Sequence, residues 1–329
     1  MVEQLHAIPP VPDSLREAAQ RGILIPFIGA GVSRLAGCPD WAGFADKALH
    51  WLIDRGKFTH AQLDQIRHLN PRVKLSLARS LERESGISIG FRTLLHPTDR
   101  QENAEGIRVY NSLFRLGKTF VTTNYDEWLD ERIVQPLPSA VPDVKAQNTP
   151  TSIQMRVIHR VEDLLPSALS TPNTVIHLHG SLRDPGGMVL TTQDYVKHYA
   201  NDRMSGDPAK ENRVLTFLGY LFREKAVLFV GYGLDELEIL EYVIVKARVQ
   251  SSREARHYII QGFFSHEIEL LNSMRTYFRD CGITLIPFLR DQKDWKQLHE
   301  VLEHFASQAP ISEPLVLQRA QEMEGLLNG

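Results

Sequence analysis

Residues 23–33 read Ile23-Leu-Ile-Pro-Phe-Ile-Gly-Ala-Gly-Val-Ser33, an apolar run that breaks at two glycines. A short apolar run ended by glycine is typical of a buried strand in a parallel sheet. Glycines directly after a strand allow a tight turn and a close approach of ligand to backbone, because no Cβ intervenes. If a helix follows, its free N–H groups and dipole suit a phosphate. The stretch therefore indicates a nucleotide site, although a plain strand-to-helix turn explains it equally well.

Three further buried strands are expected to end in polar or glycine-rich clusters. Each cluster follows its strand directly: Asn124-Tyr-Asp126 after residues 118–123, His179-Gly180 after 174–178, and Gly231-Tyr-Gly-Leu-Asp235 after 226–230. Helical patterns separate the strands, which predicts an α/β protein with a Rossmann-like, doubly wound, mostly parallel sheet and helices on both faces. In such sheets ligands bind outside the carboxyl ends of the strands, where all four clusters fall.

The remaining segments define the expected domain organisation. Residues 59–95 keep a helical pattern and are expected to form a helical insert, while residues 188–190 are expected to add a short strand. We expect one catalytic domain over residues 1–308, insert included. A helical tail over 309–329 would follow it and is a candidate for oligomer or partner contacts.

The composition argues against several classes of protein. Lys plus Arg number 37 and Asp plus Glu 40, so the net charge of -3 does not favour a general nucleic-acid binder. The only cysteines, Cys38 and Cys281, support neither a disulfide framework nor a Cys-x-x-Cys zinc site, and buried thiols are the simplest interpretation. No secretory signal and no apolar run of about 20 residues is visible, so we expect a soluble cytoplasmic protein.

The glycine turn does not complete the fingerprint of a dinucleotide-binding dehydrogenase, because Arg34 stands where a further glycine is needed. Nor does Ser33 belong to a nucleophile elbow, since Leu35 replaces the second glycine of that motif. The turn alone therefore leaves the nucleotide chemistry open.

Taken in order, the four clusters resemble the sirtuin superfamily, with a closer likeness to the bacterial sirtuin-like NAD-hydrolysing proteins of anti-phage defence. The resemblance runs roughly from residue 23 to 288 and rests on Gly29-Ala-Gly-Val-Ser33, Thr122-Thr-Asn-Tyr-Asp126, His177-Leu-His-Gly180 and Gly231-Tyr-Gly-Leu-Asp-Glu236. Each motif is weak alone, but four in the right order at strand ends form a strong signal.

The resemblance implies an NAD site along the ends of these strands. The residues it implies for binding are Gly29, Ala30, Gly31 and Ser33 around the phosphates and ribose, Asp40 and Trp41 near the nicotinamide, Asp126 beside Asn124, and Gly231, Gly233 and Asp235 near the adenosine ribose. The arginine that follows the Pro-Asp-Phe segment of deacetylating sirtuins is absent here, since Ala42 and Gly43 occupy those positions.

Asn124 and His179 are the residues that the resemblance implies for catalysis. Asn124 would contact the nicotinamide ribose and the attacking water, which suits an amide that both donates and accepts hydrogen bonds. His179 would be the general base, since imidazole titrates near pH ~6.5. His177, on the same side of the strand, is the rival base, and Asn124 could instead serve as a turn or cap residue.

One departure from the family bears on the reaction. Deacetylating sirtuins carry a four-cysteine zinc module, which two scattered cysteines cannot supply. We therefore expect a metal-independent NAD glycohydrolase that binds neither membranes nor nucleic acid. The resemblance further implies a defence effector that works as a homo-oligomer, with a HerA-like ATPase as a candidate partner. The alternatives are an NAD-dependent protein deacylase or ADP-ribosyltransferase, and a non-catalytic sensor of NAD or ADP-ribose.

Overall fold

The computed structural model describes residues 5–134, 151–200, 212–233, 239 and 257–309. Within these, seven strands form one parallel sheet in the order β5-β6-β2-β1-β7-β8-β9. The strands are β1 (Leu24–Ile28), β2 (Thr119–Thr122), β5 (Arg156–Ile158), β6 (Thr174–His177), β7 (Ala226–Val230), β8 (His257–Phe263) and β9 (Ile283–Leu289).

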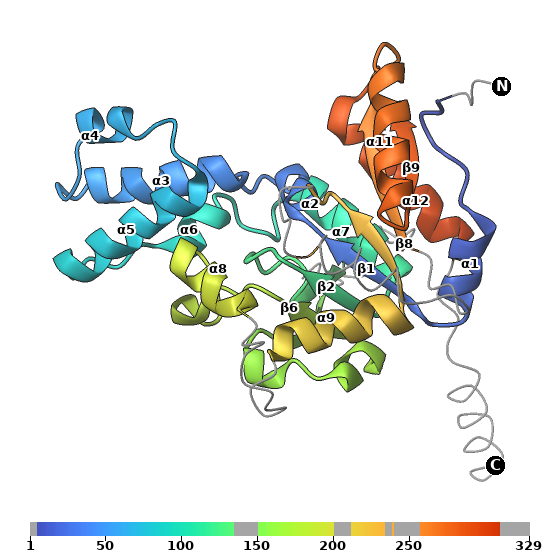
Figure 1. Ribbon diagram of the computed structural model, residues 1–329, viewed down its shortest axis with the longest axis horizontal. Coiled ribbons are helices and arrows are strands. Elements are labelled where there is room, and N and C mark those ends of the chain that lie inside the picture. Colours follow the sequence, from blue (N-terminus) through green and yellow to red (C-terminus); the bar gives the residue numbers. More distant parts are fainter. Residues whose placement is uncertain (1–4, 135–150, 201–211, 234–238, 240–256, 310–329) are drawn as a thin grey trace, which may run out of the picture.

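Helices cover both faces of the sheet (Figure 1). One face packs against α1 (Asp13–Gln20), α7 (Ala104–Leu116) and α12 (Gln297–Gln308), and the other against α9 (Arg213–Glu224) and α11 (Ile268–Asp280). Side chains of β1 alternate between the two cores, because successive residues of a strand point to opposite faces. The doubly wound α/β fold expected from the sequence is thus confirmed.

Strand β1 lies at the centre of the sheet although it contains Pro26, a residue that cannot donate to a ladder. The pairing of β1 with β2 begins only at Phe27 and Val121. Pro26 instead packs against the turn before β2, where a Cβ on Gly117 would lie 2.7 Å from the proline ring. The chain continues from β1 to β2 on one side and later returns to β7 on the other, which makes the β1–β7 boundary a topological switch point.

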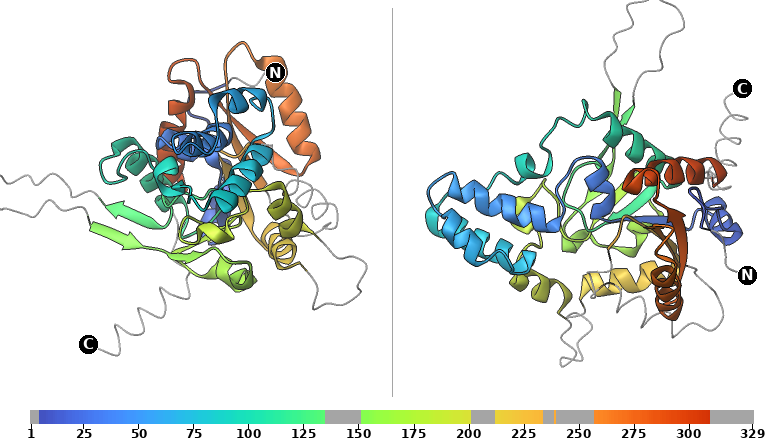
Figure 2. Two further views of the ribbon diagram at one scale, coloured as in Figure 1. Left: turned by 90° about the vertical axis from the view of Figure 1, so that its left-hand side faces the viewer. Right: turned by 90° about the horizontal axis from the view of Figure 1, so that it is seen from above.

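A helical lobe extends from one side of the sheet (Figures 1 and 2). It contains α3 (Trp41–Ile53), α4 (His60–Gln65), α5 (Pro71–Ser85), α6 (Phe91–Leu95) and α8 (Thr192–Tyr199). The lobe has its own apolar core, which includes Phe44 of α3, Leu75 of α5 and Phe91 of α6. The predicted insert over 59–95 therefore packs together with α3, which precedes it, and α8, which comes from much later in the chain.

Two features differ from the expected pattern. Residues 188–190 form no strand, and the side chains of Met188 and Leu190 instead pack into the core of the helical lobe. A second, antiparallel pair of strands, β3 (Glu131–Val134) and β4 (Thr151–Gln154), projects from the body of the protein (Figure 2). The remaining short elements are α2 (Ala30–Leu35) and the 3₁₀ turns η1 (Val161–Asp163), η2 (Pro166–Ser170), η3 (Pro185–Gly187) and η5 (Asp294–Lys296).

Candidate functional site

The loops after β1 and β7 cross each other with their backbones in contact. The backbone N–H of Gly31 donates to the carbonyl of Gly231 over 2.7 Å, and Gly29 donates to Val230 over 2.9 Å. A Cβ on Gly29 would lie 2.5 Å from the Cα of Tyr232. Gly231 has a φ of +60°, which also favours glycine. These glycines are thus required by the crossing itself, at the switch point where ligands of such folds bind.

Ser33 connects the first cluster to the second. Its hydroxyl donates to Asp126 Oδ2 over 2.6 Å and accepts from Asn124 Nδ2 over 2.8 Å. The Tyr110 hydroxyl lies 3.1 Å from the same oxygen. Ser33, Asp126 and Tyr110 are all buried. The structure therefore brings the Gly29–Ser33 loop and the Asn124–Asp126 turn together through one buried network, although the two are about 90 residues apart in sequence.

Asn124 is held on three sides. Its backbone N–H donates to Thr122 Oγ1 over 3.0 Å, its carbonyl accepts from His177 Nδ1 over 2.7 Å, and its amide nitrogen donates to Ser33. From Thr119 to Asp130, Asn124 is the one residue that is not buried. A fixed amide that reaches the surface of an otherwise buried segment is well placed to contact a ligand.

His177 holds the backbone of Asn124. Its Nε2 lies 2.8 Å from Asp130 Oδ1, and Asp130 Oδ2 accepts from Arg183 Nε over 2.8 Å. Burial would lower the pKa of His177, but the hydrogen bond and the charge of Asp130 outweigh it and raise that pKa. Both ring nitrogens of His177 face acceptors, so it serves as a buried cationic anchor in this structure.

His179, two residues later, lies in a different environment. Its Nε2 is 2.6 Å from the hydroxyl of Tyr199 and its Nδ1 is 3.3 Å from that of Tyr195, both on α8. Only 1% of His179 is exposed. Burial, followed by the nearby His198 and Arg72, lowers the pKa of His179 well below its usual value. The predicted base is therefore neutral near pH 7, as a base should be, but α8 covers it.

The residues predicted near the nicotinamide lie at the start of α3. Asp40 caps this helix, accepting from the backbone N–H of Gly43 over 2.8 Å, and is exposed. Trp41 is half-buried and stacks on Tyr125, with ring centroids 5.7 Å apart. Because Tyr125 directly follows Asn124, this stacking contact places Trp41 beside the Asn124–Asp126 turn. On the opposite side, Gly233 is exposed, whereas Asp235 lies outside the described residues.

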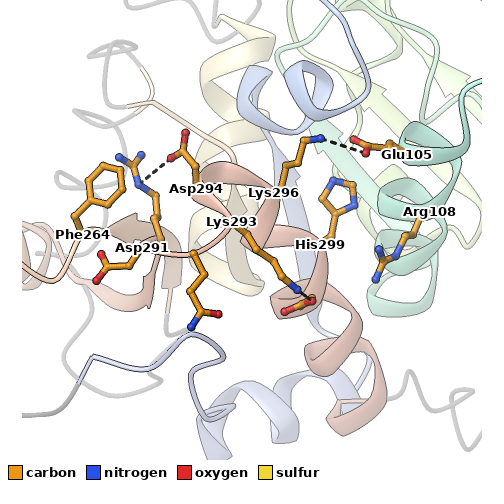
Figure 3. Close-up of a pocket in the computed structure, with 11 residues that line it drawn as sticks. Glu105, Arg108, Phe264, Asp291, Lys293, Asp294, Lys296 and His299 are labelled. Atoms are coloured by element: carbon orange, nitrogen blue, oxygen red, sulfur yellow. Dashed lines mark hydrogen bonds and ion pairs between the residues drawn. The ribbon is translucent and has the colours of Figure 1, made fainter.

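A separate cavity of about 620 Å³ lies beyond the carboxyl ends of β8 and β9 (Figure 3). It contains none of the residues predicted to bind NAD, but it opens at the same edge of the sheet. His299 of α12 lines it, is 5% exposed, and has no hydrogen-bond partner for either ring nitrogen among the described residues. Its neighbours are ion-paired, with Lys296 on Glu105 and Lys293 on Glu300. The cavity therefore holds one buried polar side chain that a ligand could satisfy.

Sequence reasoning missed the residues that support Asn124 and His179. Tyr110 lies within an ordinary amphipathic helix, and Asp130 follows the second motif without a pattern of its own. Tyr195 and Tyr199 are four residues apart on α8, a spacing that places both on one helix face. That spacing was the one available signal, but nothing in the sequence indicates that this face covers His179.

Other predictions concern metals, thiols and membranes. In the described part of the chain, no group of three or more His, Cys, Asp or Glu side chains is arranged to hold a metal ion. Both cysteines are free and buried. No helix among the described residues has the length and apolar character needed to cross a bilayer.

Comparison with known families adds one finding. A family model described as the SIR2-like domain matches residues 118–286, slightly more than half of the 329 residues. The matched span contains the Asn124, His179 and Gly231 clusters. The Gly29–Ser33 loop lies before it, and the crossing with Gly231 and the bond from Asn124 to Ser33 bring that loop to the same place.

Proposed function

The chain belongs to the family of SIR2-like domains, and on this basis we propose that it hydrolyses NAD at the nicotinamide–ribose bond. The products would be nicotinamide and ADP-ribose. The observation that carries the proposal is the hydrogen bond from Asn124 to Ser33, which joins two sirtuin-like motifs into one site at the carboxyl edge of the sheet.

The chemistry of this bond suits the groups at the site. The nicotinamide of NAD is a cation, so it leaves as a neutral molecule with the bonding electron pair and needs no strong acid. The ribose passes through an oxocarbenium-like transition state, as in glycoside cleavage. Water adds to the anomeric carbon and gives up a proton. Asn124 would orient the water or a ribose hydroxyl, and neutral His179 would accept the proton.

Helix α8 must withdraw from His179 for this reaction to occur, because the buried imidazole meets tyrosine hydroxyls where a substrate hydroxyl or water would be. The hydrogen bonds that hold this cover contribute about 1 kcal/mol each, and the burial of Tyr195 adds to them. Opening of α8 would therefore draw on the free energy of substrate binding or of assembly with other subunits.

We place the adenosine end of NAD on the other side of the switch point. Gly231 and Gly233 follow β7, and the cavity beyond β8 and β9 continues along the same edge. His299 would supply a donor or an acceptor to the nucleotide there, because both of its ring nitrogens are without partners among the described residues.

The biological part of the proposal rests on the resemblance to defence proteins. A hydrolase of NAD that is silent while α8 covers its base suits a toxic effector, released when infection is sensed. Assembly into a homo-oligomer, with a HerA-like ATPase as a further partner, would displace α8 and so activate the hydrolase. Light scattering of the purified protein, with and without such an ATPase, tests this assembly, and a strictly monomeric protein under both conditions would count against it.

The proposed reaction is tested by incubating the purified protein with NAD, with and without an acetylated peptide, and separating the products by chromatography. We expect equal amounts of nicotinamide and ADP-ribose without the peptide. Turnover that requires the peptide would identify a deacylase instead.

The burial of His179 favours one second candidate, a non-catalytic sensor that binds NAD or ADP-ribose. Calorimetry separates the two. A sensor binds NAD but produces no nicotinamide in any assembly state, whereas a hydrolase produces nicotinamide whenever α8 is displaced.

A further inference from the structure

Ser33 has a complete set of hydrogen-bond partners. A hydroxyl has one proton to donate and two lone pairs to accept with. The proton goes to Asp126 Oδ2, because a 2.6 Å contact with a carboxylate oxygen requires a donor. Asn124 Nδ2 occupies one lone pair at 2.8 Å and the Tyr110 hydroxyl, at 3.1 Å, the other. Tyr110 must therefore be the donor in its contact with Ser33.

This arrangement decides which way the Asn124 amide faces. The oxygen and nitrogen of an amide are hard to distinguish by shape, so their placement follows from the hydrogen-bond network. If the amide were reversed, its oxygen would face Ser33 Oγ, whose only proton already goes to Asp126. Only the –NH₂ group fits against Ser33. Asn124 Oδ1 therefore points away from the network, and no described residue donates to it.

We propose that Ser33, Asp126 and Tyr110 are positioning residues that fix the Asn124 amide with its oxygen facing the substrate. The proposal rests on the proposed NAD hydrolysis. It gives Asn124 the role of a hydrogen-bond acceptor, for the attacking water or a ribose hydroxyl, and removes Ser33 and Asp126 from the set of direct NAD ligands. Tyr110, outside every motif, joins the functional residues.

Exchanging the residues at positions 124 and 126 tests the direction of these hydrogen bonds. In Asp126→Asn, the new amide donates to Ser33, and the Ser33 hydroxyl then donates to Asn124. The Asn124 amide would turn so that Oδ1 faces Ser33 instead of the substrate. In Asn124→Asp, two carboxylates compete for one Ser33 proton. Each change should lower kcat by about 100-fold, in the range of a misplaced catalytic group.

The double variant Asn124→Asp with Asp126→Asn reverses the direction of the hydrogen bonds through Ser33 without removing any of them. Position 126 then donates to Ser33, Ser33 donates to position 124, and the second carboxylate oxygen of position 124 faces the substrate. We expect kcat to recover at least tenfold above either single variant. A double variant that is no better than the worse single variant would overturn the proposed direction. Circular dichroism and melting temperature check that all three variants are folded.

Ser33→Ala and Tyr110→Phe separate positioning from binding. We expect the Kd for NAD, measured by calorimetry, to stay within about threefold of the wild type, while kcat falls by about tenfold or more in Ser33→Ala. Tyr110→Phe should lower kcat by about threefold, for the loss of one hydrogen bond. Tyr220→Phe on α9 is the matched control. A Ser33→Ala variant that loses NAD affinity with kcat unchanged would make Ser33 a direct ligand instead.

A measurement without turnover keeps this proposal distinct from the proposed function. The side-chain amide protons of Asn124, assigned by NMR from their absence in Asn124→Asp, should exchange slowly with water in the wild type and faster in Ser33→Ala. That result would support the positioning network even if the protein failed to cleave NAD. Equal exchange in both proteins would overturn it, whatever the activity.

Discussion

Asn124 and His179 follow neighbouring strands of the sheet, β2 and β6, yet their surroundings are opposite. Asn124 is partly exposed and held by Thr122, Ser33 and His177. His179 is buried, and its ring nitrogens meet tyrosines of a helix from another part of the fold. The ligand-orienting half of the site is thus built into the sheet, whereas the half with the base depends on the position of α8.

Replacement of His179 is the test of this difference between Asn124 and His179 with the largest expected effect on activity. His179→Ala removes the proposed base, so we expect NAD cleavage to fall by about 10²- to 10⁴-fold, the usual contribution of general-base catalysis. Chromatographic measurement of nicotinamide release gives the rate. His304→Ala, on α12, is the matched control and should retain activity. Unchanged cleavage in His179→Ala would remove this residue from the mechanism.

Gly29→Ala should destabilise the part of the site around Asn124 and leave the part around His179 unaffected. Its Cβ would lie 2.5 Å from the Cα of Tyr232, so the two crossing loops would have to separate. We expect a loss of about 1–3 kcal/mol in the free energy of unfolding, typical of overpacking. Chemical denaturation measures it. Gly186→Ala, whose nearest contact would be 3.6 Å away, is the control. Equal stability of the two variants would show that the crossing can relax.

Lower pH should weaken the packing of α8 over His179 while leaving the contact between His177 and Asn124 intact. Burial lowers the pKa of His179, and that of His198 to about 4, so the covered state excludes protons that the open state binds. The closed position of α8 is therefore most stable above pH ~6.5. As the pH falls below this value, the equilibrium constant for opening rises by up to about tenfold per pH unit for each histidine.

His177 should respond in the opposite sense. Its pKa is raised by Asp130, so its contribution is complete below pH ~6.5 and is lost as the pH rises through the raised value. Hydrogen exchange, corrected for intrinsic rates, follows both regions at once. Faster exchange in α8 at pH 5 than at pH 7, with no increase around Asn124, is the expected pattern. The same change in both regions would contradict it.

The tyrosine that meets His179 Nε2 offers a milder test. Tyr199→Phe removes a 2.6 Å hydrogen bond worth about 0.5–1.5 kcal/mol, so α8 should open about 2- to 10-fold more often. We expect NAD cleavage to rise by a similar factor. Val196→Ala, at an exposed position of the same helix, is the control. A fall in activity in Tyr199→Phe would make Tyr199 a positioning residue for His179 rather than part of a cover.

The smallest expected effect concerns the distant end of the site. His299→Ala should raise the KM for NAD by about threefold, for one lost hydrogen bond, and leave kcat unchanged because His299 is remote from the bond that breaks. Steady-state kinetics separate the two constants, with Gln308→Ala, at the exposed end of the same helix, as control. An unchanged KM would exclude the cavity from the NAD site.

The sequence was sufficient for four neighbouring strands of the sheet, β6, β2, β1 and β7, and for the order of their motifs, because buried apolar runs and glycine turns are local signals. It predicted that Gly29, Asn124, His179 and Gly231 would follow strands whose carboxyl ends share one edge, and they do. It also explained the glycines by ligand approach, whereas their contacts show a crossing of two backbones.

What the sequence could not provide depends on contacts between distant segments. Tyr110 meets Ser33 from 77 positions away, and nothing in the local pattern of α7 marks it. The burial of His179 likewise depends on how α8 packs against the end of β6. Residues 188–190 were wrongly predicted as a strand because an apolar triplet does not reveal whether it will pair in a sheet or fill a helical core.

The most direct test of the proposed site is a structure of the protein bound to carba-NAD, an analogue whose nicotinamide–ribose bond resists cleavage. We expect Asn124 Oδ1 within about 3.2 Å of a ribose hydroxyl or an ordered water, with α8 displaced and His179 open to the ribose. An analogue bound away from Asn124, or bound while Tyr199 still covers His179, would contradict the proposed site.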